Sequence, residues 1–223
     1  MKFAEIVSRS GRIPCGPIES RACPDQYVGY LSAFGRMHQA SEWHSVQREP
    51  ALSRPEGPAL IVVLESPHIE EFEGDLGPAK NASGTGFALA CWLRTVVGHE
   101  ADDKDYSVIL VNAVQYQCSL GCAPKAHRDE IFMAVWQDYG EIDFKERLTA
   151  IHRKGDIVLC CCTAGKTKPP LRELVLDAIN DALNEAKVLR RRHPASWARN
   201  RNYREAADWE RSKKRLPKKP ICT

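Results

Sequence analysis

Short runs of apolar, β-branched residues recur along this chain, and longer stretches with helical patterns separate them. The first run, residues 59–64 (ALIVVL), is continuously apolar, which is typical of a strand covered on both faces. Further strands are predicted over residues 107–113, 156–161 and 187–189. Because strands that alternate with helices favour a parallel sheet with helices on both faces, we expect an α/β fold. The expected fold is a three-layer α/β/α sandwich around a central, mainly parallel four-stranded sheet.

The helical patterns complete this arrangement. They cover residues 85–97, 128–139, 170–185 and 203–214. The N-terminal region, residues 1–57, is rich in Gly, Pro and Ser, and we expect it to be loop apart from one helix over residues 27–39. The chain is predicted to form a single domain, residues 1–223, that ends in a basic helix and tail at residues 205–223.

Positive charge is concentrated at the C-terminal end of the chain. Residues 187–223 contain thirteen Lys or Arg and three Asp or Glu, although the whole chain carries a formal net charge of only +3. This asymmetry predicts a polyanionic partner. A solvated basic tail accounts for residues 213–219 equally well, but aromatic and apolar residues are interleaved with the arginines of residues 190–204. We expect double-stranded DNA as the partner.

Apolar runs long enough to cross a membrane do not occur in the sequence, and the N-terminus lacks the apolar segment of a secretory signal. We therefore expect a cytoplasmic monomer with no membrane partner and with reduced cysteines. The consecutive Cys160–Cys162 are expected to be small buried hydrophobic residues, because neighbours in a strand point to opposite faces.

No cofactor is expected, but two metal alternatives remain open. A zinc site would use three residues and lacks an evident fourth ligand. These residues are Cys118, Cys122 and His127. An iron–sulfur cluster would use four cysteines whose spacing fits poorly. These residues are Cys15, Cys23, Cys91 and Cys118.

Polar residues stand where the predicted strands end, namely Glu65, Asn112, Thr163 and His193. The carboxyl ends of parallel strands meet at one edge of a sheet, where active sites collect. Three of these residue types suit the cleavage of an N-glycosidic bond. A carboxylate, Glu65, can stabilise the sugar cation and orient water. A histidine, His193, can stabilise charge on the departing base. The amide of Asn112 can read the edge of a pyrimidine.

A base in a duplex must be flipped out before it can be cleaved, and this requires a stacking partner, a wedge and phosphate contacts. His68 and Phe87 are candidates to stack on the base beside Ser66, although Phe87 is an equally good core residue. Trp197 is the candidate wedge. The predicted DNA-binding residues are Arg190, Arg191, Arg192, Ser196, Trp197, Arg199 and Arg201.

In their order along the chain, these segments resemble the motifs of the uracil-DNA glycosylase superfamily. Leu64–Pro67 is similar to the superfamily's first motif, Gly-(Gln/Glu)-(Asp/Ala/Asn)-Pro, and Gly77–Ala79 to its downstream Gly-Pro element. Phe87 matches the aromatic residue that stacks on the base. Asn112 matches the base-reading asparagine at the end of strand two.

The later motifs follow in the same order. Cys162–Gly165 resembles the small-residue turn after strand three, and His193–Ala195 matches the final His-Pro-(Ser/Ala) motif. Trp197 then stands at the wedge position. The resemblance covers about residues 59–204. It implies an enzyme, a glycosylase of α/β/α fold that needs no cofactor and leaves an abasic site in DNA.

Three departures from the motifs affect the expected substrate. Ser66 stands where the best-known branch has a catalytic Asp, and the preceding Glu65 is similar to the branch that uses Glu instead. Leu64 replaces the leading Gly, and His68 replaces the residue that shapes the uracil pocket. A modified pyrimidine is therefore expected, including a hypermodified cytosine of phage DNA, which implies antiviral defence.

Alternatives to this function are repair of uracil or deaminated bases and a DNA-binding module without catalysis. A nucleotide-binding phosphate loop is disfavoured. Gly165–Thr167 resembles the end of such a loop, but the glycine required upstream is replaced by Cys160.

Overall fold

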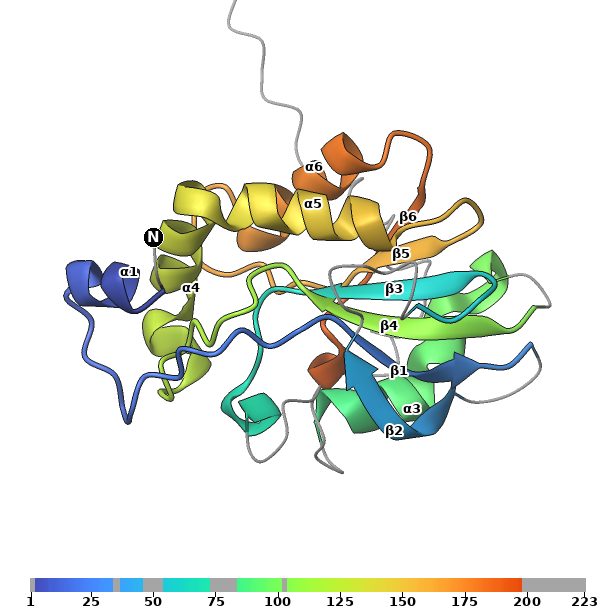
Figure 1. The fold of residues 1–223 in the computed structure, drawn as a ribbon, viewed down its shortest axis with the longest axis horizontal. Helices are drawn as coiled ribbons and strands as arrows, with labels where there is room; N and C mark the ends of the chain where they lie inside the picture. The colour runs from blue at the N-terminus through green and yellow to red at the C-terminus, as the bar shows by residue number, and fades with distance from the viewer. Residues whose placement is uncertain (1–2, 34–36, 46–53, 73–83, 102–103, 198–223) are drawn as a thin grey trace, which may run out of the picture.

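The computed structural model describes residues 3–33, 37–45, 54–72, 84–101 and 104–197. Within them, one mixed sheet has six strands in the order β2-β1-β4-β3-β5-β6 (Figure 1). The strands are β1 (Gln26–Leu31), β2 (Met37–Ser45), β3 (Ala59–Leu64), β4 (Tyr106–Asn112), β5 (Ile157–Cys160) and β6 (Lys187–Arg190). The last four are parallel neighbours, whereas β1 is antiparallel to both β2 and β4.

The four predicted strands are confirmed, but the prediction of a four-stranded sheet is wrong because β1 and β2 widen it. The prediction of a helix over residues 27–39 is also wrong, because this part of the chain forms β1 and the beginning of β2. Val28 and Leu31 are buried in the hydrophobic core, and the main chain of this segment pairs with β4. The pairing shifts register between Tyr27 and Gly29, where Gly29 has a φ of 146° that favours glycine at a bulge.

The helices lie on both faces of the sheet (Figure 1). The α-helices are α1 (Phe3–Ser10), α3 (Thr85–Val97), α4 (Pro124–Val135), α5 (Glu141–Ile151) and α6 (Leu171–Ala182). Short helical turns are η1 (Ile69–Phe72), η2 (Gly98–Glu100), η3 (Trp136–Gly140) and η4 (Pro194–Ser196). The prediction for α3 is confirmed. The helix predicted over residues 128–139 begins earlier, and α1 and α5 were not predicted. The helix predicted over residues 203–214 lies outside the described residues.

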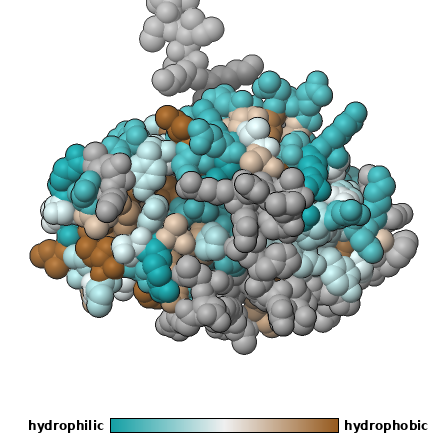
Figure 2. Space-filling model, in the orientation of Figure 1, coloured by the Kyte–Doolittle hydropathy of each residue, from teal (hydrophilic) through white to brown (hydrophobic). Residues whose placement is uncertain are grey.

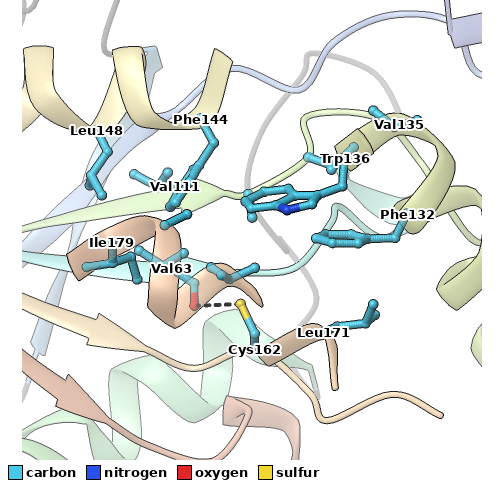
Figure 3. Packing of buried hydrophobic residues seen from close by; sticks show 14 of the residues in the cluster. Val63, Val111, Phe132, Val135, Trp136, Phe144, Leu148, Cys162, Leu171 and Ile179 are labelled. Atoms are coloured by element: carbon cyan, nitrogen blue, oxygen red, sulfur yellow. Dashed lines mark hydrogen bonds between the residues drawn. The ribbon is translucent and has the colours of Figure 1, made fainter. Parts of the chain in front are cut away.

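Alternate residues of the strands enter two separate hydrophobic clusters. On β3, Ile61 and Val63 belong to the first cluster, which lies between the sheet and α4, α5 and α6. Leu60, Val62 and Leu64 belong to the second cluster, which the sheet shares with α3. Figure 3 shows Phe132, Trp136 and Phe144 of the first cluster packed against one another. Coverage of both faces is the reason that the sequence of β3 is continuously apolar.

A buried ion pair fixes the amino ends of β3 and β5. The side chains of Arg54 and Asp156 are both fully buried, and the guanidinium donates to the carboxylate at 2.6 and 2.7 Å. The same carboxylate accepts from the backbone N–H groups of Ala59 at 2.8 Å and Arg153 at 2.7 Å. Asp156 therefore holds the loop before β5 and the first residue of β3 together.

Cys15 and Cys122 form a disulfide, with 5.1 Å between their Cα atoms. The prediction that the cysteines are reduced is wrong for this pair. The other described cysteines are free, and Cys160, Cys161 and Cys162 are fully buried, as expected. The disulfide removes one ligand from each of the two metal alternatives. Among the described residues, no three His, Cys, Asp or Glu side chains are grouped to hold a metal ion.

The described surface is mainly hydrophilic over α5 and α6, and apolar side chains gather at the end of the molecule near α1 (Figure 2). Exposed apolar residues include Ile13 and Ile142. None of the helices in the described parts of the chain is long and apolar enough to cross a membrane.

Candidate functional site

A pocket of about 330 Å³ opens where the parallel strands end. Its walls come from the segment after β3, the start of α3, helix α4, the turn after β5 and the segment after β6. The lining side chains that carry polar groups are Glu65, Ser66, His68, Glu70, Glu71, Thr85, Ser119, Arg128, Thr163 and His193. The prediction that strand-end residues meet at one place is confirmed for Glu65, Thr163 and His193.

Glu65 is the first residue after β3, and its side chain is buried, with 4% of the residue exposed. One oxygen, Oε1, accepts hydrogen bonds from the Arg128 guanidinium at 3.2 Å and the Thr163 hydroxyl at 3.1 Å. The other, Oε2, accepts from the Thr163 backbone N–H at 3.2 Å. These contacts fix the carboxylate at the pocket wall and balance its charge with a single guanidinium.

Arg128 is itself held in place on α4. Its Nε and Nη2 atoms donate to Asp129 Oδ1 at 2.9 and 2.8 Å. The other oxygen of Asp129 accepts from the backbone N–H of Lys166 at 2.6 Å, which ties α4 to the turn after β5. In that turn Gly165 has a φ of 67°, and a Cβ there would lie 3.0 Å from Asp129 Oδ2. A glycine is therefore required for this close approach.

His193 lies beside Glu65, with its Nε2 atom 4.0 Å from Glu65 Oε2. Burial lowers the pKa of His193, and this outweighs the opposing effect of Glu65. The ring is therefore neutral at pH 7. Because Nδ1 accepts a hydrogen bond from the Ala195 backbone N–H at 3.3 Å, we assign the ring proton to Nε2. Because His193 lines the pocket, this Nε2–H group is available as a hydrogen-bond donor in the pocket.

Glu71 is a buried acid that the sequence did not single out. It lies in η1, is 3% exposed and lines the pocket. Its Oε1 accepts from the His68 backbone N–H at 2.8 Å, and its Oε2 accepts from Asn112 Nδ2 at 3.5 Å. The Cys23 thiol lies 3.7 Å from Oε2. Burial raises the pKa of Glu71 from its ordinary value of 4.5 to about 7.

The raised pKa of Glu71 predicts a pH-dependent stability. Between pH 4.5 and about 7 the folded protein binds more protons at this group than the unfolded chain does, so stability falls as the pH rises. The expected loss of unfolding free energy is on the order of 3 kcal/mol. Urea denaturation at several pH values should show that the unfolding free energy of Glu71→Gln depends less on pH than that of wild type. Exposed Glu146 supplies a control, Glu146→Gln, which should behave as wild type. An unchanged pH dependence in Glu71→Gln would contradict the prediction.

The predicted substrate-binding residues occupy different positions. Ser66 and His68 line the pocket, with the His68 ring exposed. Phe87 is 45% exposed on the first turn of α3 and does not line the pocket. Asn112 is 2% exposed and does not line it either, because the carboxylate of Glu71 lies against its amide. The contact of Asn112 with a base therefore stays a prediction.

The predicted wedge, Trp197, is fully buried. Its ring belongs to the second hydrophobic cluster, and its Nε1 donates to the Arg192 carbonyl at 2.7 Å. The prediction that this indole enters the base stack does not fit, because the side chain anchors the segment in the core. Ser196 is also engaged, since its hydroxyl donates to the His193 carbonyl at 2.7 Å.

The predicted phosphate-binding arginines also have different environments. Arg191 is 8% exposed and donates to the Val96 carbonyl at 2.8 Å, and Arg190 pairs with Glu173. Both guanidinium groups therefore make contacts within the protein, and this does not fit the predicted role of a free surface cation. Arg192 is exposed. The remaining two, Arg199 and Arg201, lie outside the described residues.

Two residues of this site, Glu71 and Arg128, cannot be identified from the sequence pattern. Glu71 stands between Glu70 and Phe72 in a short helical turn, and no periodicity marks it as buried. Arg128 lies within a predicted helix, where a single arginine ordinarily faces solvent. The available signal was its position at the start of a helix that follows the second predicted strand.

No protein-family model, curated protein or solved structure matches this chain.

Proposed function

We propose that this protein is a DNA glycosylase that hydrolyses the N-glycosidic bond of a flipped-out modified pyrimidine and leaves an abasic site. One observation carries the proposal: a fixed carboxylate, Glu65, and a neutral imidazole, His193, stand side by side in a pocket at the ends of the parallel strands. The pocket volume is within the range of about 300–1,000 Å³ that is ordinary for small-ligand sites.

Glu65 and His193 have complementary roles in this mechanism. As the bond to the base breaks, the carboxylate of Glu65 stabilises the positive charge on the sugar and accepts a proton from the attacking water. His193 donates its Nε2 hydrogen to the carbonyl oxygen of the leaving base, where negative charge develops. Arg128 and Thr163 hold Glu65 in position throughout.

The proposed substrate is a modified cytosine such as the hypermodified cytosines of phage DNA, with antiviral defence as the biological role. The sequence departures at Leu64, Ser66 and His68 support a base other than plain uracil. Ser66 and His68 both line the pocket, which supports a role for these departures in the choice of base.

Mass spectrometry of bases released from several DNAs tests the function. The purified protein is incubated with DNA that contains uracil, with unmodified DNA and with phage DNA that contains hypermodified cytosine, and abasic sites are counted in parallel. We expect release of the modified cytosine with one abasic site per base. Binding to all DNAs without release of any base would instead indicate a DNA-binding module.

Exposed Arg192, beside the His193 segment, predicts a measurable effect of salt. A cation that contacts a phosphate releases counterions, so Arg192→Gln should reduce the slope of log binding constant against log salt by about 1. Fluorescence anisotropy with a labelled duplex measures this slope. The control variant is Lys154→Gln, which removes an exposed charge at the opposite end of the sheet. Equal slopes in the two variants would place the DNA elsewhere.

A further inference from the structure

The Glu71 carboxyl group is the feature of the pocket that the proposed mechanism leaves without a role. It lines the same pocket as Glu65 and His193, although neither of the roles assigned above requires it. No cation among the described residues is paired with it in an ion pair. Its hydrogen-bond donors are neutral groups: the backbone N–H of His68, the amide of Asn112 and the thiol of Cys23. A buried carboxyl group with neutral partners is in the environment that favours its protonated form.

The titratable groups around Glu71 agree with this environment. The charge of Glu65 on the segment after β3 also raises its pKa, whereas the three hydrogen bonds lower it, and burial dominates. The pKa of the neighbouring Cys23 thiol is raised by burial to well above its usual range, so this thiol stays neutral. The pKa of His193 is lowered, so that ring is neutral as well. Glu71 is therefore a buried acid with a pKa of about 7, and both the Cys23 thiol and the His193 ring beside it are neutral.

We propose that Glu71 donates a proton to ring nitrogen N3 of the departing base and thereby selects cytosine-type bases over uracil. This inference rests on the glycosylase function proposed above. A neutral carboxylic acid presents one O–H donor and one carbonyl acceptor. Cytosine and its 5-substituted forms present an acceptor at N3 and a donor at the N4 amino group, so the acid matches this edge with two hydrogen bonds.

The chemical step balances without any further reactant. The C1′–N1 bond breaks and its electron pair moves onto the base, while the proton of Glu71 passes to N3, so that the cytosine leaves as a neutral molecule. Water adds to C1′ and gives its proton to Glu65. Glu71 is left as a carboxylate and takes up a proton from solvent, and Glu65 releases one. Uracil gains nothing from this acid at N3, because its N3 already carries a hydrogen.

Asn112 has a positioning role in this scheme. Its Nδ2 lies 3.5 Å from Glu71 Oε2, and its buried Oδ1 has no hydrogen-bond partner among the described residues. A rotation of the amide by half a turn would place this oxygen against the acid, where it accepts the carboxylic proton. Asn112 thus holds Glu71 between substrates, and it acts on the base through Glu71 rather than by contact.

The test uses the full chain and short duplexes that carry one cytosine, 5-hydroxymethylcytosine, glucosylated 5-hydroxymethylcytosine or uracil. Single-turnover rates of abasic-site formation are measured from pH 6 to pH 9. For wild type on its preferred cytosine-type base, we expect the rate to fall about tenfold per pH unit above pH 7. Glu71→Gln should lower that rate ~10²–10⁴-fold and abolish the fall with pH, since an amide cannot donate a proton.

Two further variants separate catalysis from folding. Asn112→Asp places a second carboxyl group beside Glu71, so the pH at which the rate begins to fall should rise, because paired acids share a proton. A rate whose pH dependence comes from a group other than Glu71 would not shift in this way. Glu146→Gln on α5 is the matched control and should retain the wild-type rate and profile. Melting temperatures of all variants show whether each is folded.

The outcomes distinguish this inference from the function on which it rests. Release of a cytosine-type base by wild type, with an unchanged rate and pH profile in Glu71→Gln, would overturn the role of Glu71 and leave the glycosylase function standing. Release of uracil alone would likewise overturn the proposed selectivity only. If no duplex acquires an abasic site, the function fails and this inference fails with it.

Discussion

Glu65→Gln is expected to lower the single-turnover rate of base excision by ~10²–10³-fold on the preferred substrate. The substitution keeps the shape of the side chain and removes its charge, so the cation that forms on the sugar loses its nearest anion. It also leaves Arg128, whose side chain is only 15% exposed, without its carboxylate partner in the pocket. The rate of abasic-site formation under enzyme excess measures the effect directly.

The matched control for Glu65→Gln is Glu146→Gln, which removes the same charge from an exposed site on α5. It should leave the rate unchanged. His193→Ala removes the other proposed group and should also lower the rate. Full activity of both Glu65→Gln and His193→Ala on the true substrate would rule out the mechanism proposed for this pocket.

Asp156→Ala is expected to destabilise the fold by ~3–5 kcal/mol, because it leaves the buried charge of the Arg54 guanidinium without its carboxylate. The carbonyls of Ile151 and Gly57 remain as its hydrogen-bond acceptors. The backbone N–H groups of Ala59 and Arg153 lose their acceptor at the same time. The corresponding fall in melting temperature is on the order of 10 °C for a chain of this length. Differential scanning calorimetry or urea denaturation followed by circular dichroism measures this change.

A double variant shows whether the loss comes from the unpaired charge. Arg54→Met with Asp156→Leu removes both charges together and should recover a large part of the stability, since replacing a whole buried pair by apolar residues costs much less than breaking it. If the double variant is as unstable as Asp156→Ala, the backbone contacts of Asp156 would carry the effect instead of the ion pair.

The parallel core of the fold could be predicted from the sequence because its strands are covered on both faces. Burial makes β3 continuously apolar over residues 59–64, whereas a strand with one face in water would alternate apolar and polar residues. The antiparallel strands β1 and β2 could not be recognised in the same way. β1 pairs with β4 beyond the parallel strands, and its apolar residues are spaced as a helix would also require. Pairing with a distant strand decided between the two conformations.

The candidate site could be predicted only where strand ends determine position. Glu65 and His193 each follow a parallel strand, so topology alone brings them together. Glu71 belongs to a short turn whose burial depends on the loops around it, and no local pattern reports that. Neighbouring arginines favour an exposed surface position for Trp197, whereas its ring packs in the second hydrophobic cluster.

The burial of Trp197 has a consequence for how this protein can evolve. The indole reaches the core four residues after His193, so one side chain contributes to the hydrophobic cluster and also anchors the segment that carries the imidazole. On the mechanism proposed above, mutations that repack the cluster around α3 should therefore affect turnover as well as folding. In a mutational scan, tolerance at Leu89 or Leu93 should follow activity thresholds more closely than tolerance in the first cluster.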